Sequence, residues 1–455
     1  MPEEHTVDAI VVGAGPAGEA CAGRLAQGGM EVALVERELI GGECSYWACM
    51  PSKALLRPGE LAAEVGRVPG VRLAEPATDA AAALARRDEV IHGLDDSGQL
   101  PWLEERGVTL MRGQGRLAGR RSVRVGDQLL RARRAVVVAT GSGPLLPPIP
   151  GLAEAAPWTN REVTTADHVP DRLLVLGGGV VGVEMAQAYA MLGASVALVE
   201  AEARLLGREE NFAAEHVAAG LRRAGVDVRL GTTATGVSRG ERQVRVELNG
   251  GEALAGDELL VAIGREPRTH ELGLETVGLR AGEVIGVDDR MRVPGEEWLF
   301  AIGDVNGRAL LTHAGKYQAR VAADVILGRT ARASTDGQLS PRVVFTDPQV
   351  AAVGHTSATA ERAGLQVRVV DHPPGAVAGG SFHGRGPEGL ARILVDERRH
   401  VIVGATFTGP DIAELLHAAT IAMVGEVPLD RLWHAIPTFP TRSEVWLRLL
   451  EKYGL

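Results

Sequence analysis

Short runs of apolar residues that close on glycine recur along the first two-thirds of the chain. Residues 7–12 form one such run, the alanine-rich stretch that follows has helical spacing through Gln27, and a second run over 32–35 ends at Glu36. A strand, a tight turn, a helix and a second strand in this order form a βαβ unit with a parallel sheet. The pattern therefore predicts an α/β fold at the N-terminus.

The same order returns in the middle of the chain. An apolar run over 173–176 precedes a helical stretch that extends to about Leu192, and a further run over 195–199 ends at Glu200. Two complete units of this kind predict two dinucleotide-binding domains of Rossmann-like architecture.

Other apolar runs predict the remaining elements. Strands are expected over 135–139, 258–263 and 298–302, and a helix over about 313–327. After Pro341 the pattern changes to alternating strands followed by helices, which predicts a C-terminal α+β domain. Its strands are expected at about 342–346, 366–371, 390–396 and 400–407, and its helices at about 411–424 and 441–452.

Composition narrows the class of protein. At 455 residues the chain is longer than one hydrophobic core usually supports, so several domains are expected. A net charge of −10 argues against nucleic acid or an anionic membrane surface as a partner. No apolar run approaches the roughly 20 residues needed to span a bilayer, and the first residues do not resemble a secretory signal. Three cysteines are too few for a disulfide framework and fit a reducing compartment. A soluble, cytoplasmic, multidomain protein is predicted, without membrane insertion.

Glycines and acids in both βαβ units predict nucleotide ligands. The first unit carries Gly13, Gly15, Gly18 and Glu36, and the second carries Gly177, Gly179, Gly182 and Glu200. Glycines let the backbone approach a pyrophosphate, the helix N-terminus favours phosphate, and the acid accepts ribose hydroxyls. Two such sets imply two dinucleotides, most simply a flavin and a nicotinamide. An acid at 200 favours NADH over NADPH, although Arg204 and Arg208 lie close in the sequence.

Two of the three cysteines, Cys44 and Cys49, are separated by four residues and precede a predicted helix start at Pro51 and a lysine, Lys53. The positive potential of a helix N-terminus and of a lysine stabilises a thiolate, which is the form that attacks disulfides. The alternative is a pair of buried structural cysteines. Cys21 lies on the apolar face of the first predicted helix, and we expect it to pack in the core.

Together these motifs resemble the class I pyridine nucleotide-disulfide oxidoreductases, a family that includes dihydrolipoamide dehydrogenase, glutathione and mycothione reductases and mercuric reductase. The Cys-x4-Cys-x-Pro-Ser-Lys motif carries the resemblance, which covers essentially the whole chain. It implies a homodimer that binds FAD and NAD(H). The implied domains are a FAD-binding domain in two parts, 1–150 and 271–335, an NAD(P)-binding domain over 151–270 and a dimerisation domain over 336–455.

The resemblance also implies roles for single residues. Cys49 would be the flavin-proximal thiol and Cys44 the interchange thiol that meets the acceptor. Lys53 would lie beside the flavin N5 and pair with Glu184. Further FAD contacts are implied at Gly115, Thr140, Gly141, Asp304 and Thr312, and further nicotinamide-nucleotide contacts at Glu184 and Gly264. From spacing alone, Lys53 and Glu184 would be solvated surface groups and Asp304 would cap a turn. No resident metal is expected.

The C-terminal motif departs from the family pattern. The family's dithiol enzymes end in His-x-His-Pro-Thr, whose second histidine serves the partner subunit as acid/base, whereas this chain has Ile436 at that position. Isoleucine has no ionisable group, and the loss of a general base lowers the rate of the catalysed step by about 10²–10⁴-fold. His434 either replaces the missing group or packs the interface beside Trp433, and Glu444 is displaced from its expected place. We therefore do not expect efficient oxidation of dihydrolipoamide.

Two functional classes follow. The first is an oxidoreductase that passes electrons between NADH and a small disulfide or dithiol through Cys44. The second is an NADH-dependent reductase of quinones, dyes or metal ions in which the disulfide is dispensable, with an apolar mouth lined by Ile436, Phe439 and Trp47. A dihydrolipoyl dehydrogenase proper and a flavin-binding subunit with incidental activity are further alternatives. Because the chain has no additional C-terminal cysteine pair, a large protein disulfide is not an expected acceptor.

Overall fold

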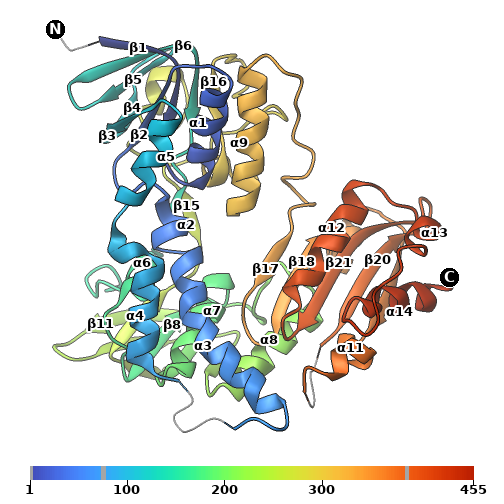
Figure 1. Cartoon of the computed structure of the whole chain (residues 1–455). Coiled ribbons are helices and arrows are strands. Elements are labelled where there is room, and N and C mark those ends of the chain that lie inside the picture. The colour runs from blue at the N-terminus through green and yellow to red at the C-terminus, as the bar shows by residue number, and fades with distance from the viewer. Residues whose placement is uncertain (1–3, 73–77, 385–388) are drawn as a thin grey trace. The chain divides into compact units, whose positions relative to one another are not determined.

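The computed structural model describes residues 4–72, 78–384 and 389–455 (Figure 1). Contacts between residues divide the chain into two compact units. Unit 1 comprises Met1–Pro51, Asp88–Leu145 and Arg265–Gly337, and unit 2 comprises Ser52–Arg87, Leu146–Gly264 and Gln338–Leu455. The first two divisions fall inside the helices α3 (Cys49–Arg67) and α4 (Ala80–Val90). This division rests on contacts between residues and does not say which nucleotide each part binds. The predicted boundaries of the FAD-binding, NAD(P)-binding and dimerisation domains therefore remain a prediction.

Unit 1 is built on a mainly parallel sheet in the order β3-β2-β1-β6-β5-β4, with a further strand, β16, paired in parallel with β6. Its strands are β1 (Glu4–Val12), β2 (Val32–Glu36), β3 (Val108–Arg112), β4 (Gly115–Leu117), β5 (Ser122–Val125), β6 (Gln128–Val138), β7 (Ser142–Pro144), β15 (Arg265–Pro267) and β16 (Leu299–Ala301). Its helices are α1 (Pro16–Gln27), α2 (Gly42–Tyr46), α5 (Leu100–Glu105) and α9 (Thr312–Ile326), with short 3-10 turns at η1 (His92–Leu94), η2 (Ser97–Gln99), η3 (Leu274–Val277) and η4 (Gly303–Asn306).

Both faces of the central strand β1 are buried. Successive side chains of a strand point to opposite faces, so Ala9 and Val11 join a core shared with α1 and α9, and Ile10 and Val12 join a second core with Trp298. Figure 1 shows α1 and α9 side by side. A strand that is covered on both sides has a continuous apolar sequence, which is the pattern that predicted it.

Unit 2 contains a parallel sheet in the order β10-β9-β8-β14, an antiparallel sheet β11-β12-β13 and an antiparallel sheet β17-β18-β21-β20-β19. Its strands are β8 (Arg172–Leu176), β9 (Ser195–Val199), β10 (Asp227–Arg229), β11 (Ala234–Arg239), β12 (Val244–Leu248), β13 (Ala253–Gly256), β14 (Glu258–Val261), β17 (Arg342–Val344), β18 (Gln349–Gly354), β19 (Val367–His372), β20 (Ala391–Asp396) and β21 (Val401–Gly409). Its helices are α6 (Asn160–Thr165), α7 (Val180–Met191), α8 (Asn211–Arg223), α10 (Ser357–Arg362), α11 (Ala378–Ser381), α12 (Leu416–Val424), α13 (Leu429–Leu432) and α14 (Glu444–Tyr453), with 3-10 turns η5 (Pro374–Ala376) and η6 (Ala413–Leu415).

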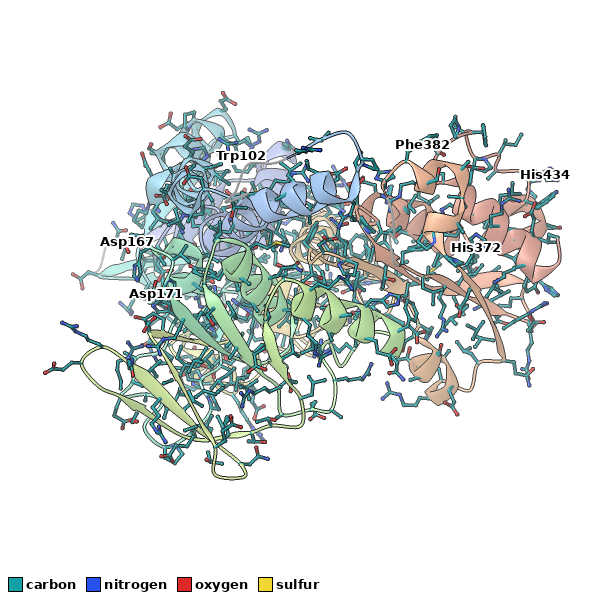
Figure 2. All side chains as sticks on the ribbon, turned by 90° about the horizontal axis from the view of Figure 1, so that it is seen from below. Trp102, Asp167, Asp171, His372, Phe382 and His434 are labelled. Carbon is teal, nitrogen blue, oxygen red and sulfur yellow. The ribbon has the colours of Figure 1, made fainter. Side chains whose placement is uncertain are left out.

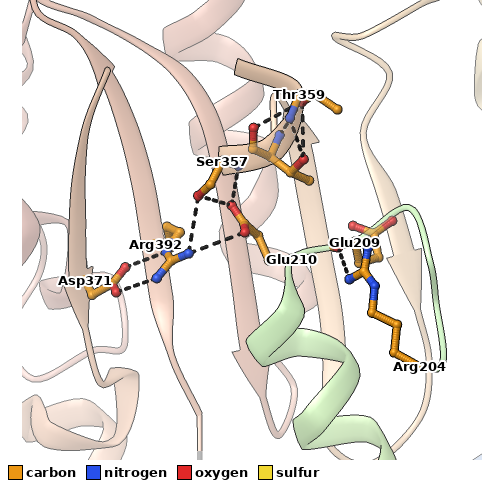
Figure 3. A network of polar contacts seen from close by, with 8 residues as sticks. Arg204, Glu209, Glu210, Ser357, Thr359, Asp371 and Arg392 are labelled. Carbon is orange, nitrogen blue, oxygen red and sulfur yellow. Dashed lines mark hydrogen bonds and ion pairs between the residues drawn. The ribbon is translucent and has the colours of Figure 1, made fainter. Parts of the chain in front are cut away.

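A polar network joins the N-terminus of α8 to the five-stranded sheet within unit 2 (Figure 3). Arg392 of β20 donates to both carboxylate oxygens of Asp371 at 2.8 Å and to Glu210 at 3.3 Å. Glu210, the residue before α8, also accepts from the backbone N and hydroxyl of Ser357 at 2.7 and 2.8 Å. A buried carboxylate requires such partners, so the network holds α8 and the sheet together.

The structure confirms the predicted fold class: two dinucleotide-binding βαβ units and a C-terminal α+β segment. Two element predictions need correction. The helix expected to begin at Pro51 begins at Cys49, and the strand expected over 135–139 is the end of the longer β6. Strand β18 was not predicted, and neither was the β11–β13 sheet. Among the described helices, none is both long and apolar enough to cross a bilayer.

Candidate active site

The turn after β1 fits a pyrophosphate. Gly13 has φ +104°, and a Cβ at Gly18 would lie 1.8 Å from the carbonyl oxygen of Gly13, so the chain has no room for a side chain at these positions. At Gly15, no described atom lies within 4 Å of a Cβ position. Glu36 Oε2 accepts a hydrogen bond from Ala14 N at 2.7 Å. Gly13 and Gly18 leave no room for a side chain, whereas Gly15 between them faces open space at the N-terminus of α1. This arrangement forms a cradle for phosphate.

Unit 2 repeats this arrangement after β8. Gly177 has φ +109°, and a Cβ at Gly182 would lie 1.9 Å from its carbonyl oxygen. The carboxylate of Glu200 accepts from Gly178 N at 2.5 Å and from Glu202 N at 2.8 Å. The backbone thus fixes the acid where a ribose would lie, and the residues fit a second dinucleotide.

Two other predicted ligands of the second nucleotide are glycines, and Arg204 was named as a residue that could favour NADPH. Gly179 is the N-cap of α7, and Gly264 is exposed after the end of β14. Arg204, which could have bound a 2′-phosphate, instead donates to the backbone carbonyls of Glu209 at 2.9 Å and Gly207 at 2.6 Å. Its guanidinium is therefore already hydrogen-bonded to the backbone of its own loop.

Three more predicted FAD residues lie in unit 1: Thr140 and Gly141 follow the end of β6, and Gly115 is the first residue of β4. Thr140 donates its hydroxyl to the carbonyl of Arg268 at 2.9 Å, and Gly141 has φ +70°. Gly115 is buried, and a Cβ there would lie 2.9 Å from Val12 Cγ1. These three residues therefore shape the backbone beside the β1 turn.

Asp304 follows β16 in the turn η4. Its Oδ2 accepts from Ser142 Oγ at 2.6 Å, and Arg265 Nε lies 4.0 Å away. Burial raises the pKa of this carboxyl, while Ser142 and Arg265 act in the opposite direction. Its described side-chain contacts reach β7 and β15 and not the turn, so the alternative of a turn cap is not supported.

Cys44 and Cys49 carry free thiols in unit 1, and the two groups lie close enough to influence one another. Cys44 lies in α2, Cys49 is the first residue of α3, and Cys49 Sγ is 3.5 Å from Thr312 Oγ1. The contact with Cys49, followed by burial, raises the pKa of the Cys44 thiol, whereas Thr312 and Lys316 lower it. Both cysteines are half-buried, unlike structural cysteines of a core. Two neighbouring thiols, one of them at the N-terminus of a helix, are suited to reversible disulfide formation.

Cys21 differs from this pair. It is 0% exposed in α1, and burial raises the pKa of its thiol to about 12. The predicted core role of Cys21 is confirmed.

Lys53 and Glu184 form an ion pair in unit 2. Lys53 Nζ donates to Glu184 Oε2 at 2.7 Å, and Glu184 Oε1 accepts from Phe345 N at 2.9 Å. The ammonium also lies 4.8 Å from the centroid of the Phe345 ring. Glu184 is only 2% exposed, which excludes the alternative of a solvated surface acid.

The C-terminal residues that were singled out lie at the surface of unit 2. Ile436 is 90% and Phe439 73% exposed, and His434 is also exposed. Figure 2 shows His434 and Phe382 at the surface of the C-terminal segment. Glu444, the first residue of α14, is buried and accepts from Gly379 N of α11 at 3.3 Å, so it links the start of α14 to α11. The roles of His434 and of an apolar mouth stay predictions.

Sequence reasoning missed several charged residues around the thiols. Glu43 accepts from Arg268 at 2.7 Å, and the charges of Lys316 and Glu19 act on the groups beside Cys44. Of these charged residues, only Glu43 could have been linked to the thiols from the sequence, because it directly precedes Cys44. Among the described residues, no group of three or more His, Cys, Asp or Glu side chains could hold a metal ion.

Comparison with known proteins adds to this geometry. The model of the family described as pyridine nucleotide-disulphide oxidoreductase matches residues 7–322, and the model of that family's dimerisation domain matches residues 340–449. The dihydrolipoyl dehydrogenase of Thermus scotoductus is 36% identical over 451 residues, which cover 96% of this chain and 95% of that protein. A mercuric reductase of Acidithiobacillus ferrooxidans is 32% identical, covering 93% of this chain and 78% of that protein.

Two solved structures share the fold. The Cu(II) complex of the HOCl-induced flavoprotein disulfide reductase RclA from Escherichia coli has a TM-score of 0.86 at 29% identity and covers 98% of this chain and 99% of that one. LpdA from Mycobacterium tuberculosis has a TM-score of 0.87 at 26% identity and covers 99% and 100% of the two chains.

Proposed function

The chain belongs to the pyridine nucleotide-disulphide oxidoreductase family and is an enzyme similar to dihydrolipoyl dehydrogenases, and we propose that it passes electrons between NADH and a small disulfide or dithiol through Cys44 and Cys49. One observation carries this proposal: Cys44 in α2 and Cys49 at the start of α3 lie close enough to influence one another, in the unit that also holds the phosphate cradle at Gly15. We further propose a cytoplasmic homodimer, which the match to the dimerisation domain supports as far as assembly is concerned.

The residues of unit 1 fit FAD. Gly13, Gly15 and Gly18 would receive the pyrophosphate, Glu36 the ribose and Asp304 the ribityl chain. FAD, when bound, takes a hydride from the nicotinamide and gives two electrons to the protein disulfide. We assign Lys53, held by Glu184, the positive charge beside its ring system.

The thiols carry the transfer to substrate. The Cys44 thiolate attacks one sulfur of a small disulfide, so that a mixed disulfide forms and the first substrate thiolate leaves. The thiolate of Cys49 then attacks the Cys44 sulfur, which releases the second substrate thiolate and leaves the Cys44–Cys49 disulfide. The pair loses two electrons and the substrate gains two. Thr312 and Lys316 partly offset the rise in the pKa of the Cys44 thiol that Cys49 and burial cause.

The first experiment is an anaerobic titration with NADH followed by an acceptor panel. We expect long-wavelength absorbance after two-electron reduction, because a thiolate would lie against the oxidised flavin. The panel should contain oxidised lipoamide, aliphatic disulfides, menadione, ferricyanide, Cu(II) and Hg(II), and we expect a small disulfide to be reduced fastest. Purified protein that stays colourless when FAD is supplied would contradict the proposal.

A second candidate function is an NADH-dependent reductase of quinones or metal ions. Its support is the exposed apolar pair Ile436 and Phe439 at the position of the family's acid/base motif. One solved structure of RclA is a Cu(II) complex, and one relative is a mercuric reductase. The panel therefore includes metal ions. Higher rates with menadione or metal ions than with every disulfide would favour this second function.

We also propose a preference for NADH, which the position of Glu200 supports. Its carboxylate is fixed by two backbone amides and would repel a 2′-phosphate, while Arg204 is engaged elsewhere. We expect Glu200→Ala to lower kcat/KM for NADH by about 10–100-fold, since charged hydrogen bonds contribute about 1.5–3 kcal/mol, and to leave kcat/KM for NADPH much less affected. Steady-state kinetics with both nucleotides test this, with Glu202→Ala as the matched control. Equal losses for both nucleotides would show that Glu200 only supports the fold.

A further inference from the structure

Cys44 lies in a helix that needs support from its surroundings. Helix α2 has five residues, and a helix this short is unstable in water without contacts to the rest of the protein. Cys49, in contrast, begins the 19-residue helix α3, and its Sγ is 3.5 Å from Thr312 Oγ1 of α9. Because a disulfide requires a specific geometry, the placement of α2 decides whether the two thiols can form one.

Backbone contacts fix the start of α2. Gly41 N donates to the carbonyl of Ala14 at 2.8 Å, and a Cβ at Gly42 would lie 2.8 Å from Gly15 Cα. Both contacts are made by the turn after β1, so they place the start of the helix beside the phosphate cradle. They leave the residues after Gly42 to be held by side chains.

Glu43, the residue before Cys44, supplies such a side chain. Its Oε1 accepts from Arg268 at 2.7 Å, and its Oε2 lies 3.7 Å from Arg265 Nη2. The side chain of Glu43 is 15% exposed, and those of the two arginines are 24% and 21% exposed. Partly buried ion pairs are screened less by water and salt than exposed pairs. The carboxylate therefore ties α2 to the segment that contains β15.

The two arginines are themselves held by β7, which pairs antiparallel with β15, and by the residue before it. Arg265 donates from Nε to Ser142 Oγ at 2.7 Å and from Nη2 to the Ser142 carbonyl at 2.8 Å. Arg268 N donates to the carbonyl of Gly141 at 3.0 Å, and a Cβ at Gly143 would lie 3.5 Å from Arg268 Nε. A guanidinium that is already oriented loses little freedom when it binds a carboxylate.

We propose that Glu43 is a positioning residue: its ion pairs with the two arginines hold Cys44 where it can form a disulfide with Cys49. The inference rests on the proposed disulfide reductase function and deepens it. The anchor should matter for the steps that make or break a bond at the Cys44 sulfur. It should matter less for electron transfer to an acceptor that needs no protein thiol.

The test is a redox equilibrium of the FAD-loaded enzyme with dithiothreitol. The protein dithiol and oxidised dithiothreitol exchange two electrons and two protons to give the protein disulfide and reduced dithiothreitol, and acid quenching, alkylation and mass spectrometry count the Cys44–Cys49 disulfide. Arg268→Met and Glu43→Gln should each lower its equilibrium constant at least about fivefold. The matched control, Arg24→Met, removes a two-pronged ion pair with Asp324 elsewhere in unit 1 and should leave the constant unchanged.

The two substitutions separate position from charge, because they change the local charge in opposite directions. If Glu43 and Arg268 acted on Cys44 through their charges alone, Arg268→Met and Glu43→Gln would shift the equilibrium constant in opposite directions. The loss of a shared contact shifts it in the same direction. The double variant should then lose no more than the larger of the two single losses.

Turnover provides a second measurement. Both variants should slow the reduction of a small disulfide at least about fivefold more than the reduction of menadione. Shifts of opposite sign, additive losses, an unchanged constant or equal slowing of both acceptors would overturn the positioning role of Glu43. Wild-type enzyme that accepts NADH electrons but reduces no small disulfide would overturn the proposed function, while the dithiothreitol equilibrium would still report on the placement of Cys44.

Conservative variants keep the test decisive if Arg268→Met or Glu43→Gln does not fold. Arg268→Lys and Glu43→Asp retain the charges but alter the reach of the side chains. Each should lower the equilibrium constant for the disulfide, by less than the variants that remove the charge. A wild-type constant in both would overturn the proposal.

Discussion

Cys44→Ser is expected to abolish NADH-dependent reduction of small disulfides, with a loss of at least about 10³-fold in kcat/KM. A serine hydroxyl is not ionised near neutral pH and cannot form the mixed disulfide. Reduction of menadione should largely persist, because it needs no protein thiol. Parallel steady-state assays with both acceptors on the same preparation check this result.

Two further variants make the Cys44 experiment specific. Cys49→Ser should remove disulfide turnover as well and also the long-wavelength absorbance of the NADH-reduced enzyme. Cys21→Ala is the matched control, because Cys21 is fully buried and its thiol stays protonated. Undiminished disulfide turnover in Cys44→Ser would reject the thiol route, and the reductase of quinones or metal ions would become the main candidate.

Much of unit 1 could be predicted because its signals are local. The run over 7–12, the glycine turn and Glu36 lie within one βαβ unit, and each has a steric or electrostatic reason to occupy its position. Cys44, Cys49 and Lys53 were equally visible as one motif. The pairing of Lys53 with Glu184, 131 positions apart, came only from the family resemblance.

The missed features are those that depend on tertiary contacts. Strand β18 is fully buried but follows Asp347-Pro348, which signals a turn, so its short apolar run was not assigned. Strands β11–β13 carry many polar residues because one of their faces is exposed. Glu210 and Arg392 contact one another across 182 positions in the network of Figure 3, and neither position carries a local motif.

Lys53→Met is expected to have the second-largest effect, a loss of about 10²–10³-fold in disulfide turnover. The ammonium is the charge that Glu184 and Phe345 hold in place, through contacts of 2.7 Å to the carboxylate and 4.8 Å to the ring centroid. Methionine keeps the length and apolar character of the side chain but has no charge to stabilise the electron-rich state of the site. Stopped-flow measurement of NADH-driven disulfide reduction gives the size of the loss.

Three companion variants separate charge from packing at Lys53. Lys53→Arg should restore part of the rate, because the charge remains but the planar guanidinium cannot reproduce the ammonium's contacts with Glu184 and Phe345. Glu184→Gln should slow turnover less than Lys53→Met, since an amide oxygen still accepts from Phe345 N and the ammonium stays present. Lys452→Met, in helix α14, is the control. If Lys53→Met retained the wild-type rate while its melting temperature fell, the ion pair would stabilise only the fold, and the charge that assists electron transfer would have to come from another residue.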